Sequence, residues 1–295
     1  MFRHIFREHG IKLFDVTMRN GLQSVKGVIP LETKKNMTVD LLKRRRPDSM
    51  EIGALVSPNV MPQMSTSIEL FKYANHYISN IKELDTKLFM LVPPRFDKLC
   101  QAHELGVRHV SIMSSASDDF QMMNVRHSTT HTLTVVTNSL RLLRFDSAKV
   151  YLSCVDQCPV LGGRLHAYQI ADSVLDYLTI PQVSEICLSD TIGTLTSMKL
   201  AEILEEVAAA GVSMNKISLH LHVNKDNVRN ATAMMYVASI AGIKKLDVSD
   251  TTTGGYNMTM DASQSHGNLT YDVLRDSIEK YTIMRMDSFE SYLEN

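Results

Sequence analysis

The sequence has few cysteines, no excess of charge of either sign and no long apolar run. Its 31 basic and 32 acidic residues give a formal net charge of −1, which argues against binding to nucleic acid or to a membrane surface. No apolar stretch is long enough to span a membrane. The basic opening MFRHIFREHG is short and carries Glu8, so we expect neither a secretory signal nor a transit peptide. With only four cysteines, we expect a reduced intracellular compartment, the cytoplasm.

Length and composition are those of an ordinary globular protein. The chain has 295 residues, of which 44% are hydrophobic, enough for one large domain with a substantial core. Nothing in the sequence demands a second domain, so we predict one domain over residues 1–295.

Short runs rich in β-branched residues alternate along the chain with longer segments of helical period. The helical segments include residues 31–44, 67–78 and 197–211, the last with Ser197 as its N-cap and Gly211 as its stop. The short runs predict eight strands, near residues 12–17, 49–56, 86–92, 109–115, 149–155, 185–190, 216–223 and 245–250.

This alternation predicts a parallel sheet, because parallel strands need a helical crossover between them. Right-handed crossovers around a closed cylinder give a (β/α)₈ TIM barrel, which is the fold we expect. An open doubly wound sheet is the alternative. That architecture usually carries a glycine-rich phosphate loop after its first strand, and the segment RNGLQSVKG is not such a loop.

Two histidines in the run KISLHLHV are the most informative local feature. His220 and His222 are two residues apart, a spacing that points both rings toward the same face of a strand. Two neutral imidazoles that face one direction can hold a metal. Histidines on a buried strand are more often satisfied core groups, so the pair alone is a weak signal.

Polar residues also follow most of the other predicted strands. Catalytic residues of a TIM barrel come from the C-terminal ends of its strands, so their convergence predicts an active site there. Each of them taken singly serves equally well as a helix cap or a turn residue. The residues are Thr17, Arg19, Asn20, Glu51, Ser153, Cys154, Asp190, Thr191, Asp250 and Thr251.

Several longer segments are similar to one protein family and together cover most of the chain. DVTMRNGLQ resembles its first-strand signature, SMEIGALVSPNVMPQM its second strand, YLSCVDQCP its fifth, LSDTIGT its sixth, HLH its metal pair and HGNL its closing loop. In this order, and at these strand ends, they resemble hydroxymethylglutaryl-CoA lyase. That family belongs to a superfamily of metal-dependent lyases and Claisen-condensing enzymes with a pyruvate carboxyltransferase-like barrel.

The resemblance implies a divalent cation, Mg²⁺ or Mn²⁺, as cofactor. Its ligands here would be Asn20, His220, His222 and Asn268. The family has an aspartate at the position of Asn20. An amide oxygen still ligates a hard cation but brings no negative charge, so we expect weaker metal binding than in the family.

The resemblance also implies which groups act on the substrate. Arg19 would stabilise the enolate of a departing acetyl thioester, and Glu51 would tie down its guanidinium. Asp190 or His220 would be the catalytic base. Lys149 occupies the position of a second family arginine, which implies substrate binding.

A further difference from the family lies after the paired glycines Gly254 and Gly255. The family has a cysteine there, which handles a proton at the acetyl carbon, whereas this chain has Tyr256. A tyrosine can donate a proton, though less readily than a thiol does, and we expect Tyr256 in the substrate site.

Our first hypothesis is a metal-dependent carbon–carbon lyase that cleaves a branched hydroxyacyl-CoA or a similar acid in a retro-Claisen reaction. The second is a degenerate barrel that binds acyl-CoA or metal with little turnover, and a related condensing or aldol enzyme is the third. We favour the lyase, because the chain keeps Arg19, Glu51, Asp190, both histidines and Asn268. The expected partner is a small molecule, and two chains are expected to pair through outer helices as a homodimer.

Overall fold

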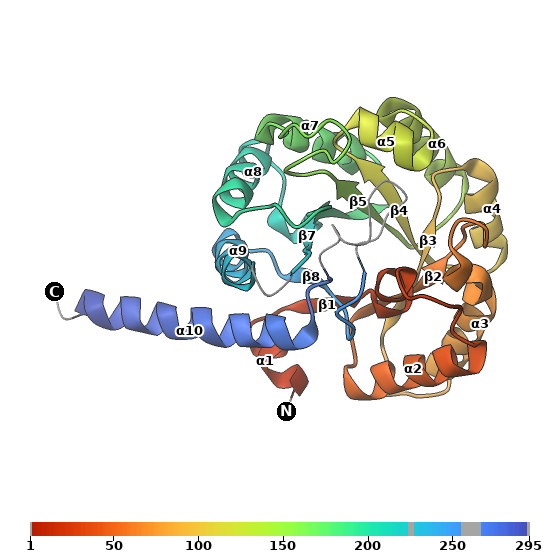
Figure 1. The fold of residues 1–295 in the computed structure, drawn as a ribbon, viewed down its shortest axis with the longest axis horizontal. Coiled ribbons are helices and arrows are strands. Elements are labelled where there is room, and N and C mark those ends of the chain that lie inside the picture. Colours follow the sequence, from red (N-terminus) through yellow and green to blue (C-terminus); the bar gives the residue numbers. More distant parts are fainter. Residues whose placement is uncertain (1, 224–226, 255–266, 294–295) are drawn as a thin grey trace.

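The computed structural model describes residues 2–223, 227–254 and 267–293. Eight parallel strands close into a barrel in chain order, as the sequence predicted (Figure 1). The closed order confirms the (β/α)₈ TIM barrel and excludes the open doubly wound sheet. The strands are β1 (Lys12–Asp15), β2 (Ser49–Ala54), β3 (Lys87–Val92), β4 (His109–Ser115), β5 (Ser147–Ser153), β6 (Val183–Ser189), β7 (Ile217–His220) and β8 (Lys245–Val248).

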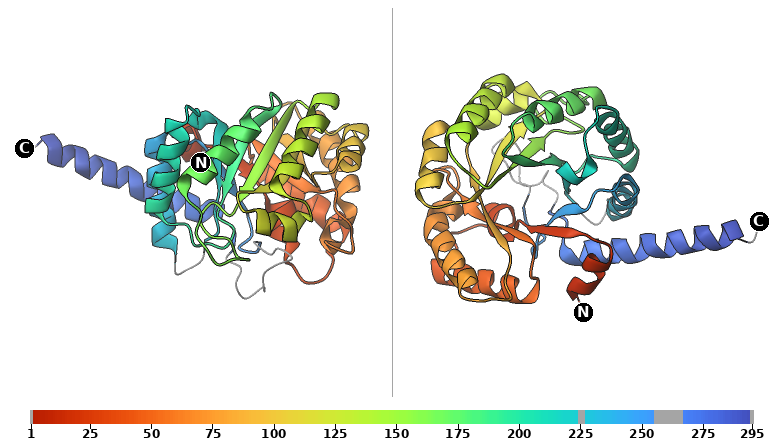
Figure 2. Two further views of the ribbon diagram at one scale, coloured as in Figure 1. Left: turned by 90° about the horizontal axis from the view of Figure 1, so that it is seen from above. Right: turned by 180° about the vertical axis from the view of Figure 1, so that it is seen from behind.

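Helices form a ring around the strands (Figure 1). The far end of the last helix extends away from the barrel in every view (Figures 1 and 2). Within the described part of the chain, no helix combines the length and apolar character that crossing a membrane requires. The helices are α1 (Phe2–Glu8), α2 (Leu31–Arg44), α3 (Ser67–Ser79), α4 (Phe96–Glu104), α5 (Asp118–Val125), α6 (Thr129–Leu142), α7 (Ala167–Leu178), α8 (Ser197–Ala209), α9 (Val228–Ala241) and α10 (Tyr271–Leu293), with the short helices η1 (Thr17–Gly21), η2 (Pro62–Thr66) and η3 (Met214–Lys216).

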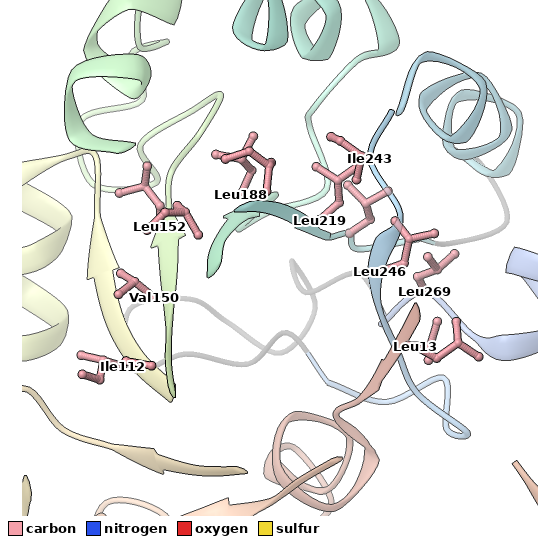
Figure 3. Close-up of a cluster of buried hydrophobic side chains, with 14 of the residues drawn as sticks. Leu13, Ile112, Val150, Leu152, Leu188, Leu219, Ile243, Leu246 and Leu269 are labelled. Atoms are coloured by element: carbon pink, nitrogen blue, oxygen red, sulfur yellow. The ribbon is translucent and has the colours of Figure 1, made fainter. Parts of the chain in front are cut away.

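Successive side chains of each strand lie on opposite faces of the barrel wall. Apolar residues such as Val150, Leu188 and Leu219 belong to the main hydrophobic cluster (Figure 3). That cluster also contains residues of the surrounding helices and so forms the core between strands and helices. The alternate positions carry apolar rings, such as Phe14 and Phe89, as well as charged groups, and Lys149 on β5 reaches Asp247 on β8 across the barrel. The same period that builds the outer core therefore places charged groups in the barrel interior.

Six strands end one to three residues earlier than the sequence predicted, and two of these differences involve functional candidates. β1 ends at Asp15, because Thr17–Gly21 turns into a short π-helix, η1. β7 ends at His220, and His222 lies past it in an isolated bridge with Asn268. Both differences bring functional candidates out of the barrel wall and toward its rim.

The observed limits of other elements also differ from the predicted limits. β5 and β6 begin two residues before the predicted starts, at Ser147 and Val183. The prediction of Ser197 as the N-cap of α8 was wrong, because the hydroxyl of Thr196 accepts the hydrogen bond from the Lys199 N–H at 3.2 Å.

Candidate active site

A cavity of about 230 Å³ lies at the C-terminal ends of the barrel strands. Four residues to which the family resemblance assigned a role line the cavity, together with Tyr151 of β5. The four are Arg19, Asn20, His220 and His222. This is the rim where TIM barrels carry their active sites. The polar lining is Arg19, Asn20, Gln23, Arg95, Asn124, Tyr151, Ser153, Ser189, Thr191, His220 and His222, and the apolar lining includes Val56, Val60, Met61, Pro93, Pro94, Met113, Phe120 and Val125.

Arg19 projects from η1 and is held by Glu51 of β2. The Arg19 Nε donates to Glu51 Oε2, and the Ser111 hydroxyl of β4 donates to the other carboxylate oxygen. Glu51 is fully buried, whereas Arg19 also lines the cavity. Burial alone would lower the pKa of Arg19, but the charge of Glu51 raises it, and the net shift is upward. The cavity is therefore lined by a permanently charged guanidinium whose position is fixed from behind.

The two histidines face each other through their Nε2 atoms, which are 3.3 Å apart. The His222 Nδ1 lies 2.6 Å from the backbone oxygen of Asp190, an acceptor only, so this nitrogen carries the proton. The His220 Nδ1 lies 3.2 Å from Asp247 Oδ2. With both protons on Nδ1, the Nε2 lone pairs point at one another, an arrangement that a shared cation or proton relieves.

Asp247 was not a sequence candidate, although it lies on β8 at the same alternation as other inward-facing residues. Its second oxygen, Oδ1, accepts from the ammonium of Lys149. Burial raises the pKa of Asp247, but the Lys149 charge and the His220 hydrogen bond lower it, and the net value lies below the usual range. The only sequence signal for Asp247 is its position in the predicted strand at residues 245–250.

Lys149, predicted to bind substrate, does not line the cavity. Its ammonium contacts Asp247, lies 3.0 Å from Glu185 Oε1 and sits 3.6 Å above the ring of Phe14. Burial lowers its pKa, but the neighbouring Asp247 charge raises it, and the net shift is upward. The structure thus gives Lys149 two carboxylate partners inside the barrel.

Asn20 and Asn268 come together beside Gly254. A Cβ atom added to Gly254 would collide with both amide side chains, and its φ of +132° is one that other residues rarely adopt. Asn268 donates from Nδ2 to the Thr253 carbonyl at 2.9 Å. Its Oδ1 is buried and has no hydrogen-bond partner among the described residues. A buried acceptor without a donor is a suitable ligand for a cation.

These residues fit a divalent metal. Two imidazole nitrogens and two amide oxygens match the ligand types that Mn²⁺ and Mg²⁺ accept. Among the described residues, no three His, Cys, Asp or Glu side chains come close enough to hold a metal ion. The amides of Asn20 and Asn268 would therefore supply the oxygen ligands, and the set brings no carboxylate.

Asp190 contributes its main chain to the site, while its carboxylate points away from the cavity. Oδ1 accepts from the N–H groups of Thr194 and Leu195 at 3.0 and 3.2 Å, and the side chain does not line the cavity. Burial raises its pKa to about 7, although these hydrogen bonds lower it in part. The backbone N–H of Asp190 donates to the His220 carbonyl at 2.9 Å. Asp190 thereby connects β6 to both histidines.

Another candidate, Asp250, falls outside this arrangement. Asp250 pairs with Arg44 and Arg45 of the α2 end, each at 2.6 Å, and does not line the cavity. Tyr256 lies outside the described residues.

Tyr151 is a cavity residue that sequence reasoning missed. Its ring lies 5.3 Å from the Arg19 guanidinium carbon, and its buried hydroxyl has no hydrogen-bond partner in the described part of the chain. Burial raises its pKa well above the usual value, so the hydroxyl keeps its proton and remains a donor.

Comparisons with known proteins agree with this geometry. Residues 10–272 match the HMGL-like protein family. The chain is 30% identical over 247 residues to 3-hydroxy-3-isohexenylglutaryl-CoA/hydroxy-methylglutaryl-CoA lyase of Pseudomonas aeruginosa, covering 83% of this chain and 78% of that protein. It is 28% identical over 266 residues to mitochondrial hydroxymethylglutaryl-CoA lyase of Bos taurus, covering 90% and 77%. The crystal structure of hydroxymethylglutaryl-CoA lyase from Pseudomonas aeruginosa aligns with a TM-score of 0.76 at 28% identity, covering 90% and 84%.

Proposed function

The chain belongs to the HMGL-like family, as its sequence predicted, and we propose that it is a carbon–carbon lyase that cleaves a 3-hydroxyacyl-CoA such as hydroxymethylglutaryl-CoA. The observation that carries this proposal is the meeting of Arg19, Asn20, His220 and His222 in one cavity. In the reaction, the substrate hydroxyl loses its proton and becomes a carbonyl. The bond between C2 and C3 breaks, and its electrons form the enolate of acetyl-CoA, which then takes up a proton.

Arg19 is suited to the enolate oxygen. A fixed cation aimed at developing negative charge costs no reorganisation during the reaction. Glu51 and Ser111 hold the guanidinium from behind, so its cavity face remains for the substrate. Tyr151 lies beside it, and we assign its hydroxyl a hydrogen bond to the same thioester oxygen.

The hydroxyl end of the substrate belongs at the histidines. Asn20, His220, His222 and Asn268 would hold the divalent cation, whose Lewis acidity makes a bound hydroxyl easier to deprotonate. Of the two candidate bases, the geometry favours His220, because its ring lines the cavity whereas the Asp190 side chain does not, and Asp190 Oδ1 accepts from the N–H groups of the following loop. Both roles use the Nε2 lone pair of the neutral ring with its proton on Nδ1, so His220 acts as the base only while Nε2 is not bound to the cation.

The test is cleavage of hydroxymethylglutaryl-CoA by the purified full chain at saturating Mn²⁺, beside the variant Asn20→Asp. We expect turnover by the unmodified chain and at least about a tenfold increase in the variant, because the new carboxylate adds charge at the metal ligands. Asn124→Asp is the matched control, since Asn124 also lines the cavity but is not a proposed ligand. If neither the unmodified chain nor Asn20→Asp cleaved hydroxymethylglutaryl-CoA, the proposal would be contradicted.

The remaining expectations stay predictions. They are the single domain over residues 1–295, the cytoplasmic location and the pairing of two chains.

A further inference from the structure

A chain of buried charges lies inside the barrel next to the cavity. Asp247 is fully buried and contacts His220 through Oδ2 and Lys149 through Oδ1. Lys149 also reaches Glu185 Oε1 at 3.0 Å, and Lys245 lies 3.0 Å from the other oxygen of Glu185. Of this chain of contacts, only His220 lines the cavity. The ring of Tyr151, which also lines the cavity, lies 5.1 Å from the Lys149 ammonium.

We propose that Asp247 is a positioning residue that fixes the tautomer and orientation of His220, and that Lys149 anchors Asp247 for this task. The inference rests on the proposed function, since its purpose is to prepare His220 as a metal ligand. A carboxylate accepts hydrogen bonds only, so Asp247 keeps the His220 proton on Nδ1 and leaves the lone pair on Nε2. That atom is the one directed at His222, 3.3 Å away.

The two imidazoles are oriented by different acceptors, which makes the proposal specific. His222 is held by the Asp190 carbonyl, and this contact involves no side chain other than the histidine itself. His220 depends on Asp247. Removal of the Asp247 carboxylate should therefore disturb one ring of the pair and spare the other.

Lys149 gives the carboxylate a fixed position. It comes from β5, on the other side of the barrel from β8, and it occupies Oδ1 so that Oδ2 is directed to His220. Its other contacts are Glu185, whose side chain is 14% exposed, and the rings of Phe14 and Tyr151. This explains why a cation predicted to bind substrate lies away from the cavity lining.

The first experiment measures Mn²⁺ binding to the full chain by titration calorimetry, without substrate. We expect Asp247→Asn to weaken the dissociation constant by about 10- to 100-fold, the usual effect of losing such a partner. Asp15→Asn is the matched control, because Asp15 is also fully buried on a neighbouring strand but contacts Thr17 and Tyr271. Unchanged affinity in Asp247→Asn, or an equal loss in Asp15→Asn, would overturn the proposal.

Asp247→Asn leaves Lys149 buried without its closest counter-ion and threatens folding. The double variant Asp247→Leu/Lys149→Met removes both charges and leaves no oxygen to accept from His220 Nδ1, and circular dichroism checks that it is folded. We expect it to show the same loss of Mn²⁺ affinity as the single variant. A folded double variant with the affinity of the unmodified chain would contradict a role for Asp247.

A second readout needs no metal. Nitrogen-15 NMR of labelled histidines reports which ring nitrogen carries the proton. We expect the Nδ1–H form of His220 to lose population in the double variant, with His222 unchanged. An unchanged His220 tautomer would overturn the positioning role. This result does not depend on Mn²⁺ binding, so it separates failure of the positioning role from failure of the proposed metal site.

Discussion

Two buried ion pairs lie close to one tyrosine ring. Arg19 pairs with Glu51, and Lys149 pairs with Asp247. The Arg19 guanidinium carbon is 5.3 Å and the Lys149 ammonium 5.1 Å from the centre of the Tyr151 ring. Both cations are almost fully buried, yet only Arg19 lines the cavity.

The difference lies in how many partners each cation has. Arg19 presents one guanidinium nitrogen to Glu51 and has further donors on the cavity side. Lys149 is a compact ammonium between two carboxylates, Asp247 and Glu185. A buried cation is therefore no mark of substrate binding in itself. What matters is whether donors remain after its structural partners are satisfied.

The largest expected effect on activity is that of Arg19→Gln. Loss of one preorganised donor to an oxyanion typically lowers kcat by about 10²–10³-fold, and we expect a loss of this size for hydroxymethylglutaryl-CoA cleavage at saturating Mn²⁺. The variant Arg19→Gln/Glu51→Gln removes the uncompensated carboxylate and should restore stability without restoring turnover. Recovery of turnover in the double variant would show that Arg19 has a purely structural role. Arg19 and Lys149 would then both be structural cations.

Lys149→Met should act chiefly on stability. Breaking one partner of a buried pair costs about 3–5 kcal/mol, which urea denaturation at neutral pH would detect as a lower free energy of unfolding. Lys245→Met is the matched control, because Lys245 contacts the same Glu185 at 3.0 Å but its side chain is 24% exposed. Exposed pairs contribute about 1 kcal/mol or less. Equal losses in the two variants would show that burial does not distinguish these lysines.

The parts of the fold that sequence reasoning predicted are those that depend on local periodicity. Alternation along each strand and the helical stretches between them were sufficient for the barrel and for all eight strands. The i, i+2 spacing of His220 and His222 placed both rings at one rim. Arg19 and Asn20 followed from their position after a strand.

Local periodicity could not predict which side chains contact each other across the barrel. Asp247 and Ser111 face inward, but their partners come from strands distant in the sequence. Which side chains meet there depends on strand tilt and stagger, and no local pattern encodes either. The sequence also does not predict where a side chain points after a strand ends. The Asp190 carboxylate, for example, points to the N–H groups of the following loop and not into the cavity.

Asp190 completes the comparison, because it is a buried carboxylate whose hydrogen bonds come from backbone N–H groups. Its pKa is raised to about 7 by burial, whereas the pKa of Asp247, beside Lys149, is lowered. A carboxyl group with a raised pKa in the folded state stabilises the fold below its unfolded pKa near 4 and loses that contribution as the pH rises to 7. Asp190→Asn keeps an oxygen that can accept from Thr194 and Leu195, but it cannot ionise.

The variant Asp190→Asn should therefore gain stability relative to the unmodified chain as the pH rises from 5 to 8, by on the order of 3 kcal/mol. Urea denaturation at several pH values measures this difference. Asp247→Asn supplies the contrast: because the contribution of Asp247 is complete above its unfolded pKa, that variant should be less stable by a constant amount over the same range. A difference for Asp190→Asn that did not change with pH would mean that its carboxylate finds enough stabilisation from backbone N–H groups alone. The contrast between the buried carboxylates would then not depend on a paired cation.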